Sequence, residues 1–248
     1  MKFRLAILPL LACLSGPAET APDLPAFDAA SIRPAAIQQP DIVQTAPGSF
    51  TVRNASILRL ICWAYDTPQF QVTGPDWLRD VRFDVVAKSS SGGDDDRLRL
   101  MLRKLLADRF GLKAHADQQE MQVYAVTLAK GGFKMPESTE DGPPIFDRGG
   151  PTLLTAHHVT MKDFAEKVSE PLRRPVIDET GLKAKYEIKI DVAAYMQSTG
   201  QTLGDGEVDV MAVLFNALQQ QLGVKLESKK ATVRILTVDH VEKQPTEN

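Results

Sequence analysis

The sequence is poor in the residues that most often carry catalysis or cross-linking. Its 248 residues include two cysteines and four histidines. Only Cys62 lies outside the N-terminal stretch, and one cysteine cannot form an internal disulfide bond. The G-x-S-x-G elbow, the S-x-x-K set and the H-E-x-x-H zinc helix are absent. These absences exclude the recognised forms of α/β-hydrolase, penicillin-binding enzyme and zinc peptidase.

Long apolar runs and an excess of basic charge are also missing. No run of eighteen apolar residues follows the N-terminus, so the sequence predicts no membrane-spanning helix there. The formal net charge is −3, which argues against a nucleic-acid partner because binding to a phosphate backbone depends on cationic side chains. We find no motif for a cofactor and no convincing ligand spacing for a metal.

The N-terminus has the pattern of a secretory signal peptide over residues 1–18. Lys2 and Arg4 precede a short apolar stretch, and small residues follow it. The segment Leu10–Cys13 also resembles a lipoprotein signal in which Cys13 would be lipidated, but the apolar region before it is short, so simple cleavage is favoured. Cleavage would leave 27 basic and 32 acidic residues, a net charge of −5. We therefore predict an extracytoplasmic protein, periplasmic or secreted.

What the sequence does contain is an internal repeat. Residues 50–130 and 153–241 carry the same order of helix caps, apolar faces and strands. The first helix of each half follows a hydroxyl residue, Ser56 or Thr160, that can cap its first turn. The apolar positions of these helices are spaced for one helix face and match at an offset of 104: Ile57, Leu60, Ile61 and Ala64, and then Met161, Phe164, Ala165 and Val168.

Strands and a second helix follow in both halves. Alternating apolar residues predict strands at 82–88 and 185–191. The second helices match at an offset of 112, and Gly111 and Gly223 end them. The other expected elements are short strands at 70–72 and 176–177, second helices at 98–110 and 210–222, and closing hairpins that pair 112–115 with 121–128 and 224–227 with 233–238.

We therefore predict an α+β fold with two repeated β-α-β-β-α-β-β lobes, each a small sheet with two helices. The remaining segments are a Pro/Ala-rich extended arm at 19–49, a Pro/Gly-rich linker at 131–152, a loop at 193–206 and a polar tail at 242–248, which is expected to be mobile. Phe27 and Ile32 are the residues that can anchor the arm to the body.

Aromatic side chains are the best candidates for ligand recognition. Trp77 lies in a connection, and Trp63 and Tyr65 lie at the end of the first helix. Exposed rings at these places can stack on a sugar or a peptide, although packing between elements is the favoured interpretation of each. Cys62, beside Trp63, is expected to be a packed and inert thiol.

The His157–His158 pair is the one concentration of imidazoles. Adjacent residues in a strand point to opposite faces, so the two rings are not expected to bind one metal ion. Arg53 and Asn54 stand at the equivalent positions of the first half. We therefore interpret the pair as a polar strand edge. Acidic clusters, and the Gly204–Gly206 loop, are interpreted as helix caps and solvated loops rather than as catalytic or calcium sites.

Blocks across most of the chain resemble one known family, the domain of unknown function 3738 of secreted proteins from soil bacteria, abundant in acidobacteria. The blocks are Phe27–Pro34, Gly74–Leu78, Arg97–Leu112 with Val123–Val126, Arg174–Leu182 and Val238–Lys243. The resemblance implies export and a two-copy domain, which in some relatives follows a membrane metallopeptidase similar to β-lactam sensors. It brings no established activity. Each half also loosely resembles the short N-terminal domains of secretins and TonB-dependent receptors.

Together these observations favour a non-catalytic extracytoplasmic binding or assembly module. Its partner would be an envelope protein or an extracellular polymer, and the crevice between the lobes is the expected site. Two alternatives stay open: an unrecognised secreted enzyme acting on cell-wall or environmental polymers, and a sensory ectodomain related to membrane-metallopeptidase signalling proteins. The enzyme alternative predicts a deep pocket that holds several titratable groups with displaced pKa values.

Overall fold

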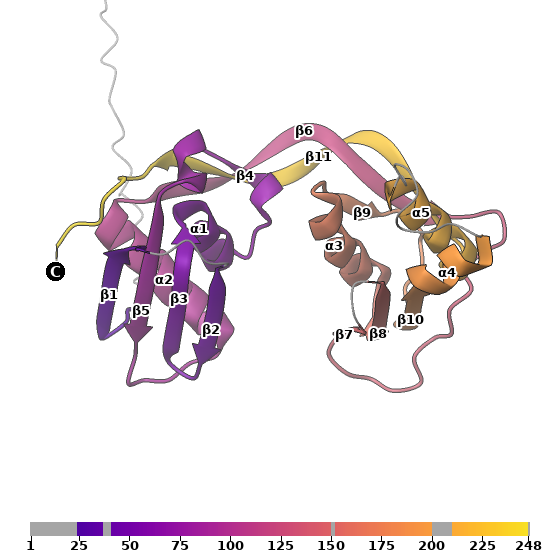
Figure 1. Ribbon diagram of the computed structural model, residues 1–248, viewed down its shortest axis with the longest axis horizontal. Helices are drawn as coiled ribbons and strands as arrows, with labels where there is room; N and C mark the ends of the chain where they lie inside the picture. Colours follow the sequence, from indigo (N-terminus) through magenta and orange to yellow (C-terminus); the bar gives the residue numbers. More distant parts are fainter. Residues whose placement is uncertain (1–23, 37–40, 150–151, 200–209, 248) are drawn as a thin grey trace, which may run out of the picture.

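The computed structural model describes residues 24–36, 41–149, 152–199 and 210–247 and has the α+β fold predicted from the sequence. Its elements form two lobes at opposite ends of the molecule, and a long two-stranded ribbon arches across both of them (Figure 1). The signal segment, Cys13 and the Gly204–Gly206 loop lie outside the described residues.

Lobe 1 is an antiparallel sheet, in the strand order β1-β5-β3-β2, covered by two helices. Its elements are β1 (Ala29–Pro34), β2 (Ile42–Ala46), β3 (Ser49–Ser56), α1 (Ile57–Tyr65), β5 (Arg82–Lys88) and α2 (Asp95–Phe110). Ser56 Oγ accepts a hydrogen bond from Arg59 N–H at 3.1 Å, and Gly111 ends α2 in the left-handed conformation at φ +59°. Both predicted helix boundaries are therefore confirmed.

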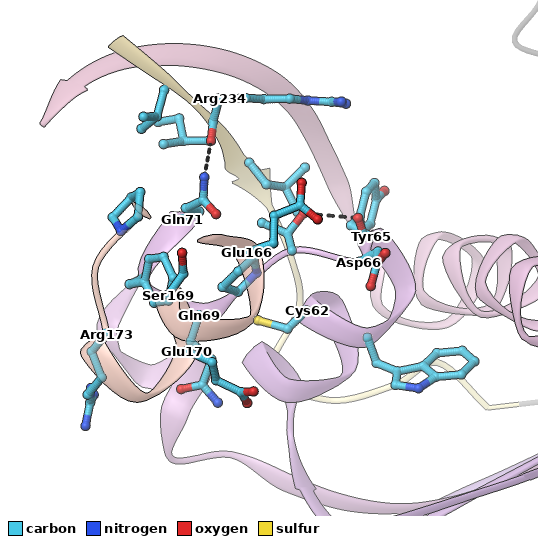
Figure 2. Close-up of a pocket in the computed structure, with 18 of the residues that line it drawn as sticks. Cys62, Tyr65, Asp66, Gln69, Gln71, Glu166, Ser169, Glu170, Arg173 and Arg234 are labelled. Atoms are coloured by element: carbon cyan, nitrogen blue, oxygen red, sulfur yellow. Dashed lines mark hydrogen bonds between the residues drawn. The ribbon is translucent and has the colours of Figure 1, made fainter. Parts of the chain in front are cut away.

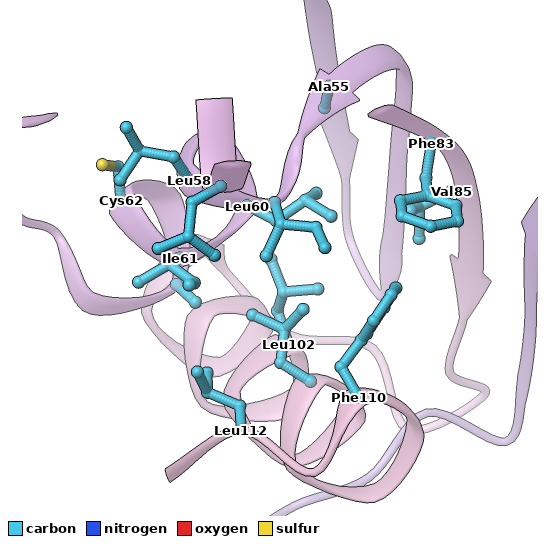
Figure 3. Close-up of a cluster of buried hydrophobic side chains, with 14 of the residues drawn as sticks. Ala55, Leu58, Leu60, Ile61, Cys62, Phe83, Val85, Leu102, Phe110 and Leu112 are labelled. Carbon is cyan, nitrogen blue, oxygen red and sulfur yellow. The ribbon is translucent and has the colours of Figure 1, made fainter. Parts of the chain in front are cut away.

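The core of lobe 1 lies between this sheet and the two helices (Figure 3). Phe83 of β5 meets Phe110 of α2 edge to face, with ring centroids 5.1 Å apart. Phe27 and Ile32 pack against the same core, as expected for anchors. The extended arm that carries them supplies the strands β1 and β2, and β1 pairs with β5 over its whole length.

Lobe 2 is a second α+β lobe with less regular structure. Its sheet has the order β10-β8-β7, and its elements are β7 (Ile145–Arg148), β8 (Leu153–Val159), α3 (Met161–Leu172), β10 (Tyr186–Asp191), α4 (Val192–Thr199), α5 (Val210–Ala217) and the π-helical turn η3 (Leu218–Leu222). Thr160 and Asp163 form a complete capping box at the start of α3. Strand β7 lies in the predicted linker and α4 in the predicted loop, which corrects both predictions.

A third sheet is shared by the lobes, in the order β4-β11-β6-β9. Its strands are β4 (Val72–Thr73), β6 (Lys113–Leu128), β9 (Val176–Asp178) and β11 (Val224–His240). The predicted closing hairpins are wrong, because β6 and β11 are each continuous and pair with one another along the ribbon. Residues 116–120 and 228–232 contain no glycine, proline or Asn-Gly turn, so nothing in them favours a reversal over an extended strand.

The pairing within the ribbon is symmetric about its centre. Glu120 pairs with Thr232, which lies 112 residues further along the chain, and the pairs Val126–Leu226 and Ala114–Val238 are related by the same offset. Strand β4 then joins the last part of β11, and β9 joins the last part of β6, both in parallel. Each half of the chain therefore completes its sheet with strand residues from the other half.

Two smaller predictions also need correction. Residues 69–71 form a 3₁₀ turn, so the strand expected at 70–72 begins only at Val72. The tail that was expected to be mobile is held against the end of α2 over its described residues, 242–247, where Glu242 N–H donates to Phe110 O and Thr246 N–H donates to Arg109 O, both at 2.7 Å. These bonds satisfy carbonyl groups that the end of a helix leaves without partners.

Candidate functional site

A cleft of about 1320 Å³ lies between the lobes, next to the ribbon (Figure 2). One wall is the end of α1 with the segment after it, and the other is α3 with the segment after it. Residues Val233–Leu236 of β11 line the cleft between these walls. The expected crevice between the lobes is therefore present in the structure.

The two walls come from matching positions of the two halves. Several lining residues of α1 and α3 are separated by 104 positions, the offset that relates these helices in the sequence: Arg59 and Asp163, Cys62 and Glu166, Trp63 and Lys167, Asp66 and Glu170, and Gln69 and Arg173. The same helix of each half faces the cleft, but the side chains differ in charge.

The wall of lobe 1 is basic, whereas carboxylates outnumber cations on the wall of lobe 2. The charged lining residues of lobe 1 are Arg59, Arg79, Arg99, Arg103 and Asp66. Those of lobe 2 are Asp163, Glu166, Lys167, Glu170 and Arg173, and β11 adds Arg234. A ligand in this cleft therefore meets opposite charges on its two sides.

Trp63 and Tyr65 both line the cleft, and arginines from α2 cover them. The Arg99 guanidinium lies 5.1 Å from the Trp63 ring centroid and donates to the Trp63 carbonyl at 2.7 Å. Arg103 lies 4.7 Å from the Tyr65 ring and donates to the Ala64 carbonyl at 2.8 Å. These cations bind the carbonyl end of α1, where a helix carries partial negative charge. The aromatic residues are thus half-buried parts of the wall.

Titratable groups at the base of this wall favour their neutral forms. Cys62 is only 5% exposed, and burial raises the pKa of its thiol to about 12. Burial also raises the pKa of Tyr65. Both shifts oppose the thiolate or phenolate that a nucleophile or base would need. Cys62 is therefore the packed and inert thiol that the sequence predicts.

Trp77 lies apart from the cleft lining. It sits in the 3₁₀ turn η2 (Asp76–Arg79), is half-buried against the core of lobe 1, and has Lys243 Nζ 5.3 Å from its ring centroid. Its cationic partner comes from the C-terminal tail. In this position the ring holds the tail against the lobe.

His157 and His158 approach one carboxylate, so the expectation that they point to opposite sides is wrong. Two residues of β8, His157 and His158, oppose the single residue Glu187 of β10, and His158 has φ +56°. This bulge breaks the alternation of the strand. His157 Nδ1 lies 2.5 Å from Glu187 Oε2, and His158 Nδ1 lies 3.6 Å from Glu187 Oε1.

Ser138 completes this cluster from the linker. Its hydroxyl donates to Glu187 Oε1 at 2.6 Å and lies 2.7 Å from His158 Nδ1. The Ser138 hydrogen bond is the main reason that the pKa of Glu187 lies below its usual value. Sequence reasoning missed Ser138 and Glu187, because no spacing connects them. None of these residues lines the cleft, and their bonds fasten the linker to the edge of lobe 2.

Arg53 lies in the equivalent bulge of lobe 1. Residues Arg53 and Asn54 of β3 oppose Asp84 of β5, and Asn54 has φ +52°. The Asn54 N–H donates to Asp84 Oδ1 at 2.8 Å, as the His158 N–H does to Glu187 Oε1 at 3.3 Å. Arg53 itself is exposed. A carboxylate opposite a bulge is thus a feature of both lobes, and its structural role is to bind the bulged main chain.

The comparison with protein families gives one match. Residues 58–241, most of the chain, match the family described as protein of unknown function (DUF3738). The chain belongs to this family. Neither the curated proteins nor the solved structures gave a match. Among the described residues, every helix is too short or too polar to span a membrane.

Proposed function

We propose that this member of the family is a non-catalytic extracytoplasmic binding or assembly module that holds its ligand between the lobes. The observation that carries the proposal is the cleft, whose two walls are the same helix of each half with different charges. Such a site recognises a ligand by charge and orientation rather than by transforming it. The neutral states favoured by Cys62 and Tyr65 agree with a binding role.

We also propose that the two lobes are copies of one ancestral unit. The symmetric register of the ribbon supports this, as do the paired bulges at Asn54 and His158. A duplicated unit places its equivalent helices around one axis, which is how the cleft acquires two matching walls.

Export is proposed from the N-terminal pattern of residues 1–18 and from the family resemblance. Cleavage after Ala18 is preferred over lipidation of Cys13. Intact-mass measurement of the protein recovered from the periplasm or the medium of the producing cell tests this. A mass that begins at Glu19 supports cleavage, while a diacylglyceryl mass on Cys13 replaces it with the anchored form.

Capture of partners from an envelope extract tests the binding role. The immobilised mature protein is compared with a variant that reverses two cleft charges, Arg79→Glu with Glu170→Lys. A matched control reverses two exposed charges elsewhere, Arg33→Glu with Glu137→Lys. We expect the wild type and the control to capture the same specific partner. The cleft variant should capture at least about tenfold less of it, which corresponds to about 1.4 kcal/mol of binding free energy.

The enzyme alternative predicts a different result in the same experiment. If no partner is enriched and the purified protein depolymerises a cell-wall or environmental polymer, the chain is an enzyme and the proposal is wrong. Capture that is equal in all three proteins places the binding surface outside the cleft, which also contradicts the proposal.

A further inference from the structure

We propose that the ligand of the cleft is a peptide segment that carries carboxylates toward lobe 1 and a basic group toward lobe 2. This rests on the proposed binding role and specifies its ligand. In this arrangement the acidic part of the peptide contacts the arginines beside α1, and a lysine, arginine or amino terminus contacts the carboxylates of α3.

The size of the cleft favours a segment of a polymer over a single metabolite. Pockets for small molecules usually enclose about 300–1,000 Å³, whereas this cleft has about 1320 Å³ and remains open to solvent between the lobes. A metabolite would leave much of this space to water. A chain of several residues can touch both walls at once.

The charge of the cleft runs against the charge of the whole protein. The chain has a net charge of −3, but the cleft is lined by seven cations and four carboxylates. Cations are thus concentrated at the cleft between the lobes. This distribution favours a ligand with an overall negative charge, because the local potential attracts it and repels cationic competitors.

Some of these charges are already neutralised and others are available. Arg59 pairs with Asp41 at 2.7 Å, and Arg99 pairs with Asp66 at 2.8 Å. The side chains of Arg79, Arg234 and Glu170 are exposed, and no described residue forms an ion pair with them. Arginine binds a carboxylate through two parallel hydrogen bonds, so Arg79 and Arg234 are suited to the acidic part of a peptide.

The wall of lobe 2 distinguishes a peptide from an acidic polysaccharide. Glu166 and Glu170 lie on the exposed face of α3, and Asp163 lies one turn earlier. A polyuronate has no cation for these carboxylates, and like charges brought together across an interface oppose binding. A peptide can present both signs within a few residues. The half-buried rings of Trp63 and Phe70 add apolar contact area that suits side chains of a peptide.

Fluorescence anisotropy with synthetic probes tests this inference. The principal probe is a labelled peptide of about twelve residues with glutamates in one half and lysines in the other. Comparison probes contain glutamate only or lysine only in a Gly/Ser background, and labelled polygalacturonate represents an acidic polysaccharide. We expect the mixed-charge peptide to bind at least about tenfold more tightly than the lysine peptide, and its affinity to fall as salt is raised.

Single substitutions show which charged part of the peptide contacts which wall of the cleft. Arg79→Gln is expected to weaken the glutamate-only and the mixed-charge probes, whereas Glu170→Gln weakens the mixed-charge probe alone. A loss of about two- to fivefold for each is expected for an exposed charge pair. Arg33→Gln and Glu137→Gln, which alter exposed charges outside the cleft, are the matched controls and leave the affinities unchanged.

Three results overturn the inference. Equal or tighter binding of polygalacturonate, with no loss in Glu170→Gln, makes the ligand an acidic polymer rather than a peptide. Equal weakening by the control variants shows a nonspecific charge effect. If no probe binds while envelope capture still depends on the cleft charges, the peptide class is wrong and the binding module stands; if both fail, neither proposal survives.

Discussion

Both lobes pack helices against a small sheet, but the edge of β5 in lobe 1 is covered by a further strand, whereas the edge of β10 in lobe 2 is not. In lobe 1, β1 pairs with β5 along its whole length. In lobe 2, the corresponding edge of β10 receives only the Glu137–Tyr186 bridge and, at its other end, the Gln221 amide, which exchanges two hydrogen bonds of 2.8 Å with the main chain of Asp191. Lobe 2 replaces a strand with side-chain contacts.

The second helices differ in the same direction. Helix α2 is a regular helix of 16 residues, whereas α5 ends after Ala217 and continues as a π-helical turn to Leu222. Because π-helical turns are rare and occur mostly as single turns inside α-helices, the second helix of lobe 2 is the less regular of the two. The comparison shows that lobe 1 has the more regular scaffold and that lobe 2 has the less regular helices and sheet edge. The shared ribbon should nevertheless make the two halves unfold together.

The largest expected effect tests this coupling. Phe110 in lobe 1 and Phe164 in lobe 2 are both fully buried, so Phe110→Ala and Phe164→Ala should each lower the free energy of unfolding by about 3–5 kcal/mol. Both tryptophans lie in lobe 1, so their fluorescence during urea unfolding reports that lobe, while circular dichroism reports both. We expect Phe164→Ala to shift both signals equally.

An unmoved fluorescence midpoint in Phe164→Ala would show that the lobes unfold independently. Ile42→Ala is the control, because Ile42 is 58% exposed on an edge strand, and it should change the free energy of unfolding by less than about 0.5 kcal/mol.

The helix caps give a smaller contrast. Thr160 and Asp163 bond reciprocally, whereas Ser56 only accepts a bond from Arg59 N–H. Thr160→Ala should therefore cost about 1–2 kcal/mol of unfolding free energy and Ser56→Ala about 1 kcal/mol. Thermal denaturation of both variants checks this, with Thr160→Ser as a control that keeps the cap. An equal or larger loss in Ser56→Ala would contradict the expected order.

The linker attachment in lobe 2 predicts a dependence on pH. Ser138→Ala removes the hydrogen bond that most lowers the pKa of Glu187, at a cost of about 1 kcal/mol at neutral pH. Because the folded-state pKa is lowered, this stability is present above the unfolded pKa and is lost as pH falls through the folded pKa. The melting temperatures of wild type and variant should converge in acid. A constant difference down to pH 3 would exclude this role for Ser138.

Two ion pairs at the ends of the ribbon provide the smallest expected effects on stability. The pH dependences of these two effects run in opposite directions. In lobe 1, the hydrogen bond that His115 Nδ1 donates to the Asp239 carboxylate raises the pKa of His115, so its contribution is present below pH about 6.5 and is lost as pH rises through the folded pKa. At the equivalent position of lobe 2, Lys225 lowers the pKa of Glu227, so its contribution is lost as pH falls.

Two variants measure this contrast. His115→Gln should destabilise the protein slightly at pH 5.5 and not at pH 9, while Glu227→Gln should do so at pH 7 and not at pH 3. Differential scanning calorimetry over this range is sufficient. Destabilisation that changes with pH in the same direction for both variants would mean that the ribbon ends do not titrate as described.

Much of the local structure could be predicted from the sequence because it depends on local chemistry. Ser56 and Thr160 specify helix starts, Gly111 and Gly223 specify helix ends, and the period of two specifies β5 and β10. The sequence could not distinguish two short hairpins from one long ribbon, because both structures have the same local pattern. Only the pairing between residues distant in sequence decides which of the two forms. The bulge at His158 was hidden for the same reason.

The candidate site was only partly predictable. Trp63 and Tyr65 were identified from the sequence and line the cleft, whereas Trp77, Arg53 and the histidine pair lie outside its lining. Arg79 and Glu170 were missed, because a charged residue on an exposed helix face looks like ordinary solvated surface until a second lobe stands opposite it. The offset of 104 that pairs Glu170 with Asp66 was a signal that could have revealed Glu170. No such pairing pointed to Arg79.

Cross-linking at the centre of the ribbon tests the account most directly. Glu120 and Thr232 oppose one another across the two strands, at a Cα separation that suits a disulfide bond. In a Cys13→Ser background with buried Cys62 left in place, Glu120→Cys/Thr232→Cys should oxidise almost completely within one chain. Ala116→Cys/Thr232→Cys, about 13 Å out of register, should not. Failure of the first pair to cross-link, or equal cross-linking of both, would contradict a ribbon shared by the two lobes.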